Sequence, residues 1–217
     1  MRPTSEPAER LLESLRCQPL LVVLRPQEPL QAAPHLERLR DLRLHHVEIA
    51  WNHHPCWSRQ CQVLVGEFPE LCLGAASVCC PQALAAAADA GLGYAVSPTL
   101  DDQLVAAAQA TDFILVPGVM TPSEVHQARC WGCSIVKLFP AATLGLHYWR
   151  RLAAPLGEPL PFCIAAGGLD AADVMPWLEA GVDAVALGSR FTQSPSAFDG
   201  LESILHALGT SCRPAQP

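Results

Sequence analysis

Eight short apolar runs, separated by longer amphipathic segments, recur along most of this chain of 217 residues. The runs are rich in Val, Ile, Leu and Ala and alternate little with polar residues, which is typical of parallel strands buried on both faces. We expect strands at Pro19–Arg25, His46–Ala50, Cys72–Ser77, Tyr94–Ser97, Phe113–Pro117, Ser134–Phe139, Phe162–Ala166 and Ala184–Leu187.

The segments between these runs carry helical patterns. One begins with a proline suited to the first helical turn, and two end in Ala-Gly, where glycine can take the left-handed conformation that ends a helix. We expect helices at Glu28–Arg43, Pro81–Ala90, Asp101–Ala110, Pro122–Trp131, Leu146–Ala153, Ala171–Ala180 and Ala197–Leu208.

This alternation predicts an α/β fold, a (βα)8 TIM barrel that forms a single domain over residues 1–217. An extra N-terminal helix at about Glu6–Arg16 precedes the first strand and should cover the bottom of the barrel. A short flexible tail is expected after about residue 211. An open doubly wound sheet is the alternative, but no G-x-G-x-x-G motif follows the first strand.

Composition narrows the classes of function. No apolar run approaches the roughly 20 residues that a membrane-spanning helix needs, and the first 16 residues do not resemble a secretory signal, so we expect a cytoplasmic protein with no membrane partner. The formal net charge is -7 and no basic stripe is present, which disfavours nucleic acid as a partner. The ten cysteines do not indicate a disulfide scaffold, because such scaffolds are short and loop-rich.

The chain contains thirteen arginines but a single lysine, Lys137. Lysine can act as an amine nucleophile, whereas arginine stays protonated. Lys137 lies in an apolar strand, where burial lowers the pKa of the ammonium group and makes the free amine accessible. Glu48 interrupts another apolar strand and is placed to move protons beside it. The alternatives are a purely structural Lys137–Glu48 pair and a glutamate that faces the helices.

Further polar and glycine residues follow the strands, at the end of a barrel where chemistry gathers. Two adjacent strands end in Gly167-Gly168 and Gly188-Ser189, which can bind phosphate or another anion through backbone N–H groups, although turns also need glycine. Histidines occur at His45-His46 and His53-His54. Because neighbours in a strand point to opposite faces, each pair offers at most one inward ligand, and we expect no metal site.

Taken in order, these features resemble the bacterial 2-keto-3-deoxy-6-phosphogluconate (KDPG) and 4-hydroxy-2-oxoglutarate aldolase family, from about Leu20 to Phe191. The order and spacing of the motifs together are specific, whereas any one motif alone is not. The motifs are Val47–Ile49, Gly74–Val78, Ser97-Pro98, Pro117–Glu124, Val136–Ala141, Ala166–Leu169 and Leu187–Ser189.

The resemblance implies a class I lyase of carbohydrate metabolism, of the Entner-Doudoroff type, that needs no metal and no cofactor beyond a covalent Schiff base on Lys137. It would cleave a phosphorylated 2-keto-3-deoxy sugar acid to pyruvate and glyceraldehyde 3-phosphate, and 4-hydroxy-2-oxoglutarate to pyruvate and glyoxylate. Glu48 matches the proton-transfer glutamate of the family, which is typically a homotrimer. The substrate-binding positions implied are Arg25, Ser77, Asn52, Phe139, Gly167, Gly168, Gly188 and Ser189.

One position departs from the family pattern. The family usually has an arginine four residues after the glutamate, where it holds the pyruvate carboxylate, and here that residue is Asn52. A charge-assisted hydrogen bond is worth roughly 1.5–3 kcal/mol, so its loss weakens binding unless Arg25 compensates or the substrate differs. Two other functions stay open: a non-catalytic barrel that binds a phosphorylated metabolite, because of the missing arginine, and a metal-dependent class II lyase that uses the histidine cluster.

Overall fold

The computed structural model describes residues 5–188 and 198–210, whose strands form one sheet. The strands are β1 (Leu20–Leu24), β2 (His46–Ala50), β3 (Cys72–Ala76), β4 (Tyr94–Val96), β5 (Leu115–Val116), β6 (Gly118–Val119), β7 (Ile135–Leu138), β8 (Phe162–Ala166) and β9 (Ala184–Leu187). Their order in the sheet is β5-β4-β3-β2-β1-β9-β8-β7-β6, and every neighbouring pair is parallel.

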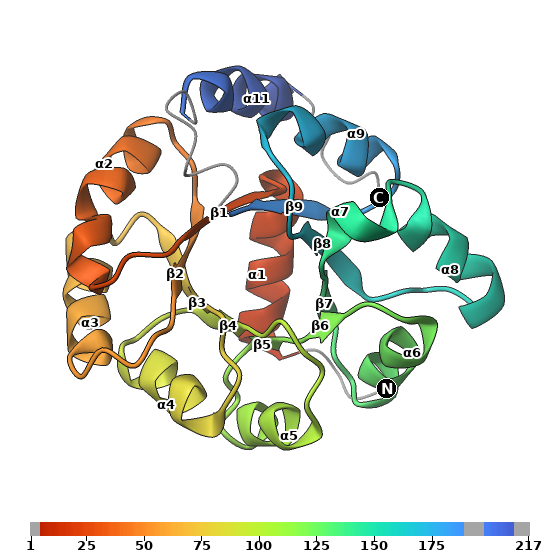
Figure 1. The fold of residues 1–217 in the computed structure, drawn as a ribbon, viewed down its shortest axis with the longest axis horizontal. Coiled ribbons are helices and arrows are strands. Elements are labelled where there is room, and N and C mark those ends of the chain that lie inside the picture. Colours follow the sequence, from red (N-terminus) through yellow and green to blue (C-terminus); the bar gives the residue numbers. More distant parts are fainter. Residues whose placement is uncertain (1–4, 189–197, 211–217) are drawn as a thin grey trace.

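β5 and β6 are two halves of one barrel strand. β5 pairs with β4, β6 pairs with β7, and Pro117 lies between the two halves. Proline has no N–H to donate, so the ladder is interrupted there, but the Pro117 carbonyl still accepts a hydrogen bond of 2.8 Å from the Lys137 N–H. This shared strand closes the sheet into an eight-stranded barrel (Figure 1). The predicted (βα)8 barrel is confirmed, and the open doubly wound sheet is wrong.

The helices surround the barrel, except for one that lies across its end (Figure 1). They are α1 (Glu6–Cys17), α2 (Ala33–Asp41), α3 (Trp57–Glu67), α4 (Pro81–Asp89), α5 (Asp102–Ala110), α6 (Pro122–Cys130), α7 (Ala141–Leu144), α8 (Tyr148–Leu156), α9 (Val174–Glu179) and α11 (Asp199–Thr210), with 3-10 turns η1 (Pro29–Ala32) and η2 (Ala171–Asp173). In the described part of the chain, none of them is both long and apolar enough to cross a membrane.

The helices begin and end close to the predicted positions where local signals are strong. At the start of α6, the Thr121 hydroxyl accepts from the Glu124 N–H, and the Glu124 carboxylate accepts from the Thr121 N–H, which forms a capping box. Two helices were not predicted, α3 and the short α7. The buried residues Trp57, Cys61 and Leu64 of α3 have helical spacing, but the N-cap of neither helix makes a side-chain hydrogen bond. α3 has neither a capping hydrogen bond nor a proline at its start, and α7 has only four residues, so both lack strong local signals.

Two separate cores explain why the strands show little alternation. Leu21 and Val23 of β1 point into the lumen of the barrel, whereas Leu20, Val22 and Leu24 pack against the surrounding helices. All five residues are therefore buried, although successive side chains still point to opposite faces.

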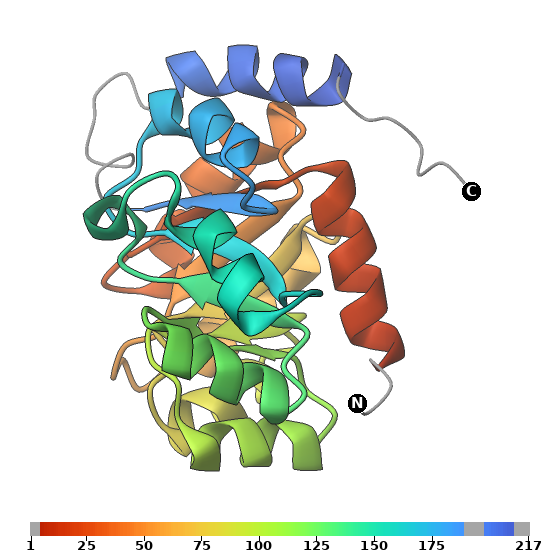
Figure 2. The same cartoon turned by 90° about the vertical axis from the view of Figure 1, so that its right-hand side faces the viewer.

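α1 covers the amino-terminal end of the barrel, as predicted (Figure 2). Leu11, Leu12 and Leu15 pack against the side chains that fill the lumen. The Ser14 hydroxyl and His46 Nε2 lie 2.9 Å apart and join the helix to β2. With this end covered, substrate access is left to the carboxyl ends of the strands. The tail expected after about residue 211 lies outside the described residues.

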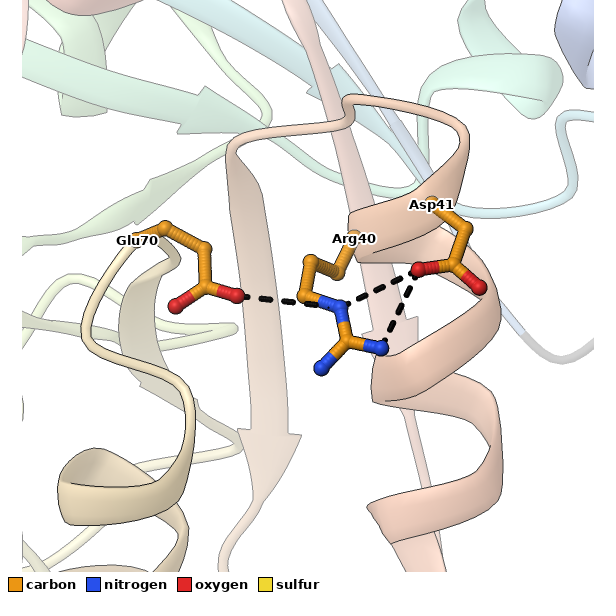
Figure 3. A network of polar contacts seen from close by, with 3 residues as sticks. All are labelled: Arg40, Asp41 and Glu70. Carbon is orange, nitrogen blue, oxygen red and sulfur yellow. Dashed lines mark hydrogen bonds and ion pairs between the residues drawn. The ribbon is translucent and has the colours of Figure 1, made fainter.

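A charged cluster on the surface lies near the same amino-terminal end. Arg40, close to the end of α2, contacts Asp41 Oδ1 through its Nε and Nη2, both at 3.1 Å, and Glu70 Oε1 at 3.7 Å (Figure 3). Glu70 precedes β3, so the cluster ties α2 to the turn that enters this strand. All three side chains are at least one-third exposed, so the cluster contributes little to stability, and it lies at the wrong end of the strands for chemistry.

Candidate active site

Lys137 and Glu48 both point into the lumen of the barrel. Glu48 on β2 pairs with Val23 of β1, and Lys137 on β7 pairs with Ile164 of β8; both partners belong to the lumen core. The flanking residues of each strand, such as Val47 beside the glutamate, face the helices instead. Glu48 is 1% exposed and Lys137 is 5% exposed. The fold thus brings together two ionisable groups that lie 89 positions apart along the chain.

Burial shifts both groups towards their neutral forms. It raises the pKa of Glu48 from 4.5 to about 7, a rise that the charges of Lys137 and Arg25 only partly oppose. It lowers the pKa of Lys137 below its ordinary value of 10.5, although Glu48 acts in the opposite direction. The pair therefore combines a carboxyl group that exchanges protons near neutral pH with an amine that gives up its proton more easily than an exposed lysine.

The hydrogen bonding of Glu48 does not resemble that of a structural ion pair. Glu48 Oε2 is buried and has no hydrogen-bond partner among the described residues. A buried ion pair stabilises a fold only when its geometry is good and its remaining lone pairs are satisfied. A polar group that is left open in this way is available to a substrate or to water.

An aromatic ring lies beside the lysine. Lys137 Nζ lies 4.8 Å from the centroid of the Phe139 ring, close enough for a cation–π contact. Phe139 packs against Gly167, where a Cβ atom would lie 2.8 Å from the ring. Gly167 also has a φ of 95°, which side chains with a Cβ rarely adopt. The glycine pair after β8 is therefore required in part for packing.

Arg25 and Ser77 meet at the carboxyl ends of β1 and β3. The Arg25 guanidinium donates a hydrogen bond of 2.8 Å to the Ser77 hydroxyl, and Ser77 has a φ of 60°. The positive charge of Arg25 acts on both Glu48 and Lys137, so the guanidinium belongs to the same site. Arg25 is itself exposed, so it stands at the mouth of the lumen, where an anionic group of a substrate would enter.

Asn52 is engaged within the loops around the site. Its side-chain nitrogen donates to the carbonyl oxygens of Pro26 and Gln27, and its oxygen accepts from the His54 N–H. Both N–H donors of the amide are therefore used. Asn52 thus holds the loop that follows β1. Arg25, which precedes this loop, lies next to Ser77.

The candidate anion-binding residues lie at the carboxyl ends of neighbouring strands. Gly167 and Gly168 follow β8, and Gly188 follows β9, which pairs with β8 in parallel. Gly167 and Gly168 have φ values of 95° and 80°. Ser189, predicted beside them, lies outside the described residues.

Two residues near Lys137 and Glu48 were not among the site residues predicted from the sequence. Tyr94 on β4 is fully buried in the lumen core, and Glu48 is among the charges that act on it. Cys79, in the loop after β3, is exposed and lies close enough for Lys137 to affect it. Because side chains alternate along a strand and Ala95 packs outward against the helices, Tyr94 could have been expected to point into the lumen. The sequence does not show which residue it faces there.

Two of the histidines singled out from the sequence, His46 and His54, make local hydrogen bonds. His46 Nε2 lies against Ser14 at the covered end of the barrel, and the His54 ring accepts from the Cys56 N–H. Within residues 5–188 and 198–210, no three His, Cys, Asp or Glu side chains come together as a metal ion would require.

Sequence comparison finds one family along most of the chain. The profile of the family described as "Aldolase: KDPG and KHG aldolase" matches residues 11–202. The 2-dehydro-3-deoxy-6-phosphogalactonate aldolase of Escherichia coli is 28% identical over 172 residues, which is 79% of this chain and 83% of the relative. The KHG/KDPG aldolase of the same organism is 34% identical over 118 residues, and this match spans 54% of each protein.

Structure comparison supports the same assignment at the level of the fold. The 2-keto-3-deoxy-6-phosphogluconate aldolase of Zymomonas mobilis superimposes with a TM-score of 0.77 and 24% identity, over 94% of this chain and 99% of that one. The fold is thus shared over 94% of this chain, and the family profile spans nearly all of the barrel. The chain belongs to the KDPG and KHG aldolase family and is a lyase of that family.

Proposed function

We propose that this protein is a class I aldolase that cleaves a phosphorylated 2-keto-3-deoxy sugar acid to pyruvate and glyceraldehyde 3-phosphate through a Schiff base on Lys137. One observation carries the proposal: the only lysine of the chain lies in the lumen of the barrel, beside a buried glutamate. Burial favours both the free amine that attacks a ketone and a carboxyl group that exchanges protons near neutral pH.

In the first steps, the Lys137 amine attacks the C2 carbonyl of the substrate and forms a carbinolamine. Glu48 supplies the proton with which the C2 hydroxyl leaves as water, and an iminium ion remains. The water-poor lumen suits this step, because the attacking amine is neutral there. The mechanism needs no metal and no organic cofactor.

The C3–C4 bond then breaks. The Glu48 carboxylate takes the proton of the C4 hydroxyl, the bond electrons move into the iminium ion, and the aldehyde leaves from the resulting enamine. Glu48 returns the proton to C3, and water hydrolyses the imine to release pyruvate and the free lysine. One carboxyl group that acts alternately as acid and base suits a pKa of about 7.

We assign the substrate carboxylate to Arg25 and Ser77, and the phosphate to the glycines after β8 and β9. Phe139 would contact the carbon chain of the substrate. The Arg25 guanidinium and the Ser77 hydroxyl already lie 2.8 Å apart, and a carboxylate can bind a guanidinium through two hydrogen bonds. Arg25 and Ser77 can therefore bind the carboxylate in place of Asn52, whose amide N–H groups are already used in hydrogen bonds to the loop. Phosphate would bind to backbone N–H groups of Gly167, Gly168, Gly188 and Ser189.

Two epimeric substrates compete for this assignment. The phosphogalactonate aldolase described above aligns over a larger share of both chains than the KHG/KDPG aldolase does. By their names, the first acts on the phosphogalactonate and the second on KHG and KDPG. The two sugar acids differ at the C4 hydroxyl and give the same products. We therefore include the phosphogalactonate epimer in the substrate class, together with KDPG and 4-hydroxy-2-oxoglutarate.

The test is borohydride trapping. The protein is incubated with pyruvate and borohydride, and the modified peptide is identified by mass spectrometry, with Lys137→Met as the control. We expect one adduct, on Lys137, and none in the variant. A wild-type protein that forms no adduct, or forms it elsewhere, refutes the Schiff-base mechanism.

Turnover distinguishes the remaining possibilities. Pyruvate release is measured from both phosphorylated epimers and from 4-hydroxy-2-oxoglutarate, with and without a chelator. Activity that survives the chelator and disappears in Lys137→Met contradicts both a class II lyase and a non-catalytic binding barrel. Light scattering on the same samples tests the homotrimer that the family resemblance implies.

A further inference from the structure

Besides Glu48 and Lys137, the lumen holds a buried polar side chain that the proposed reaction does not use. Tyr94 on β4 is 0% exposed, and its hydroxyl has no hydrogen-bond partner among the described residues. A buried hydroxyl without a partner is costly, so an unpaired phenol in the core calls for an explanation.

The strand register brings this phenol to the catalytic glutamate. Glu48 pairs with Gly74, and Gly74 pairs with Tyr94, so the three residues lie side by side on adjacent strands. A Cβ atom on Gly74 would lie 2.5 Å from Cζ of Tyr94, so the ring crosses the space above this glycine towards β2. Paired residues on one face of a sheet have Cβ atoms about 5 Å apart, which places the phenol oxygen beside the Glu48 side chain.

The two facing groups complement each other. Glu48 Oε2 and the Tyr94 hydroxyl are both buried and both lack a partner. Burial, together with the charge of Glu48, raises the pKa of Tyr94 well above its ordinary value of 10, so the phenol keeps its proton and stays a donor. A carboxylate oxygen is the matching acceptor.

We propose that Tyr94 is a positioning residue, whose hydroxyl donates a hydrogen bond to one buried water that in turn donates to Glu48 Oε2, and that this link holds the carboxylate towards Lys137. The inference rests on the proposed function, because it concerns the proton-transfer group of that reaction. The link favours the charged form of the carboxylate, so Tyr94 keeps the pKa of Glu48 lower than burial alone would set it.

The other groups around Glu48 are charged or lie further away. Lys137 faces it from β7 and Arg25 from the end of β1, and both already lower its pKa. Cys72 of β3 faces the Tyr94 hydroxyl, and His46 lies one inward position below Glu48, bound to Ser14. Among the neutral groups, Tyr94 is the one whose side chain lies over Gly74, in register with Glu48.

Tyr94→Phe removes the donor and keeps the ring. The chain has one other tyrosine, Tyr148, whose hydroxyl donates to the Met120 carbonyl at 2.7 Å, so Tyr148→Phe is a matched control. The titration of Glu48 is followed by carboxyl carbon NMR, with the signal assigned through Glu48→Gln. We expect Tyr94→Phe to raise the pKa of Glu48 by about one unit and Tyr148→Phe to leave it unchanged.

Kinetics give a second readout. The limb of the kcat profile that reports Glu48 should move with the NMR titration, and kcat at pH 6 should fall up to about tenfold, because less carboxylate is present. KM should change little, because Tyr94 is not expected to touch the substrate. A loss of packing alone would lower stability without moving this limb.

A graded donor keeps the inference testable even if Tyr94→Phe folds poorly. In the Tyr148→Phe background, 3-fluorotyrosine enters position 94 alone and is a stronger donor than tyrosine. The pKa of Glu48 should then fall in the order Phe, Tyr, 3-fluorotyrosine at this position. An equal pKa with tyrosine and with 3-fluorotyrosine overturns the inference.

The two proposals fail in different ways. If pyruvate is not trapped on Lys137 in the wild-type protein, the proposed function is wrong, and the NMR titration still decides whether Tyr94 is linked to Glu48. If trapping succeeds and the Glu48 titration is the same in every Tyr94 variant, the aldolase stands and the inference about Tyr94 falls.

Discussion

The buried carboxyl group of Glu48 should make the stability of this protein depend on pH, and Glu48→Gln should remove that dependence. Glutamine keeps the size of the side chain but cannot ionise. The pKa of Glu48 is about 7 in the folded protein and 4.5 ordinarily. An acid whose folded pKa is raised favours folding fully below its unfolded pKa, and this contribution is lost as pH rises to the folded pKa.

The size of the effect follows from the shift. The two pKa values differ by 7 − 4.5 = 2.5 units. One pKa unit corresponds to about 1.4 kcal/mol, so wild-type folding loses about 3 kcal/mol from this group between pH 4.5 and 7. The free energy of unfolding of Glu48→Gln minus that of wild type should therefore increase by about 3 kcal/mol over this range.

Urea denaturation of both proteins at pH 4.5 to 8 measures this difference, with reductant present because the chain has ten cysteines. Taking the difference cancels the titration of other groups, His46 among them. Loss of Glu48 also lowers the pKa of Lys137 further. This shift likewise makes the difference in unfolding free energy between variant and wild type increase as pH rises. In a Lys137→Met background, the increase in this free-energy difference should occur at higher pH. The lysine charge lowers the pKa of Glu48, so its removal raises that pKa. A difference that stays constant with pH, or decreases, refutes the reasoning.

Three further changes test the packing around the site. His46 is buried and its pKa falls from 6.5 to about 4, so folding loses about 3 kcal/mol as pH drops through that range, and His46→Asn should flatten this acid limb in urea titrations. Gly167→Ala places a Cβ atom 2.8 Å from the Phe139 ring and should lower Tm and slow pyruvate trapping more than Gly145→Ala, which has a φ of 84° but no neighbour within 4 Å. Asn52→Ala removes three hydrogen bonds and should cost about 1–3 kcal/mol of stability in denaturant titrations; an unchanged Tm would contradict its structural role.

The barrel, and the burial of Glu48 and Lys137 within it, could be predicted because their signals are local. Apolar runs such as His46–Ala50 and Phe162–Ala166 begin and end as predicted, since a strand buried on both faces needs apolar residues at nearly every position. The exceptions, Glu48 and Lys137, stand out within their own strands. The fifth barrel strand was predicted as one piece ending at Pro117, but pairing continues to Val119, because only the ladder hydrogen bond at the proline is lost.

Which residues face each other depends on how the barrel closes and on the register of its strands. Neither can be inferred from the pattern of a short segment. The sequence determined which side chains are buried and which of them can carry charge, because periodicity and residue type are properties of short segments. Only the tertiary structure decided that the amide of Asn52 holds the loop after β1 and that Arg25 meets Ser77. It also decided that the Tyr94 ring lies over Gly74, on the side of Glu48, since three consecutive strands must first pair in one register.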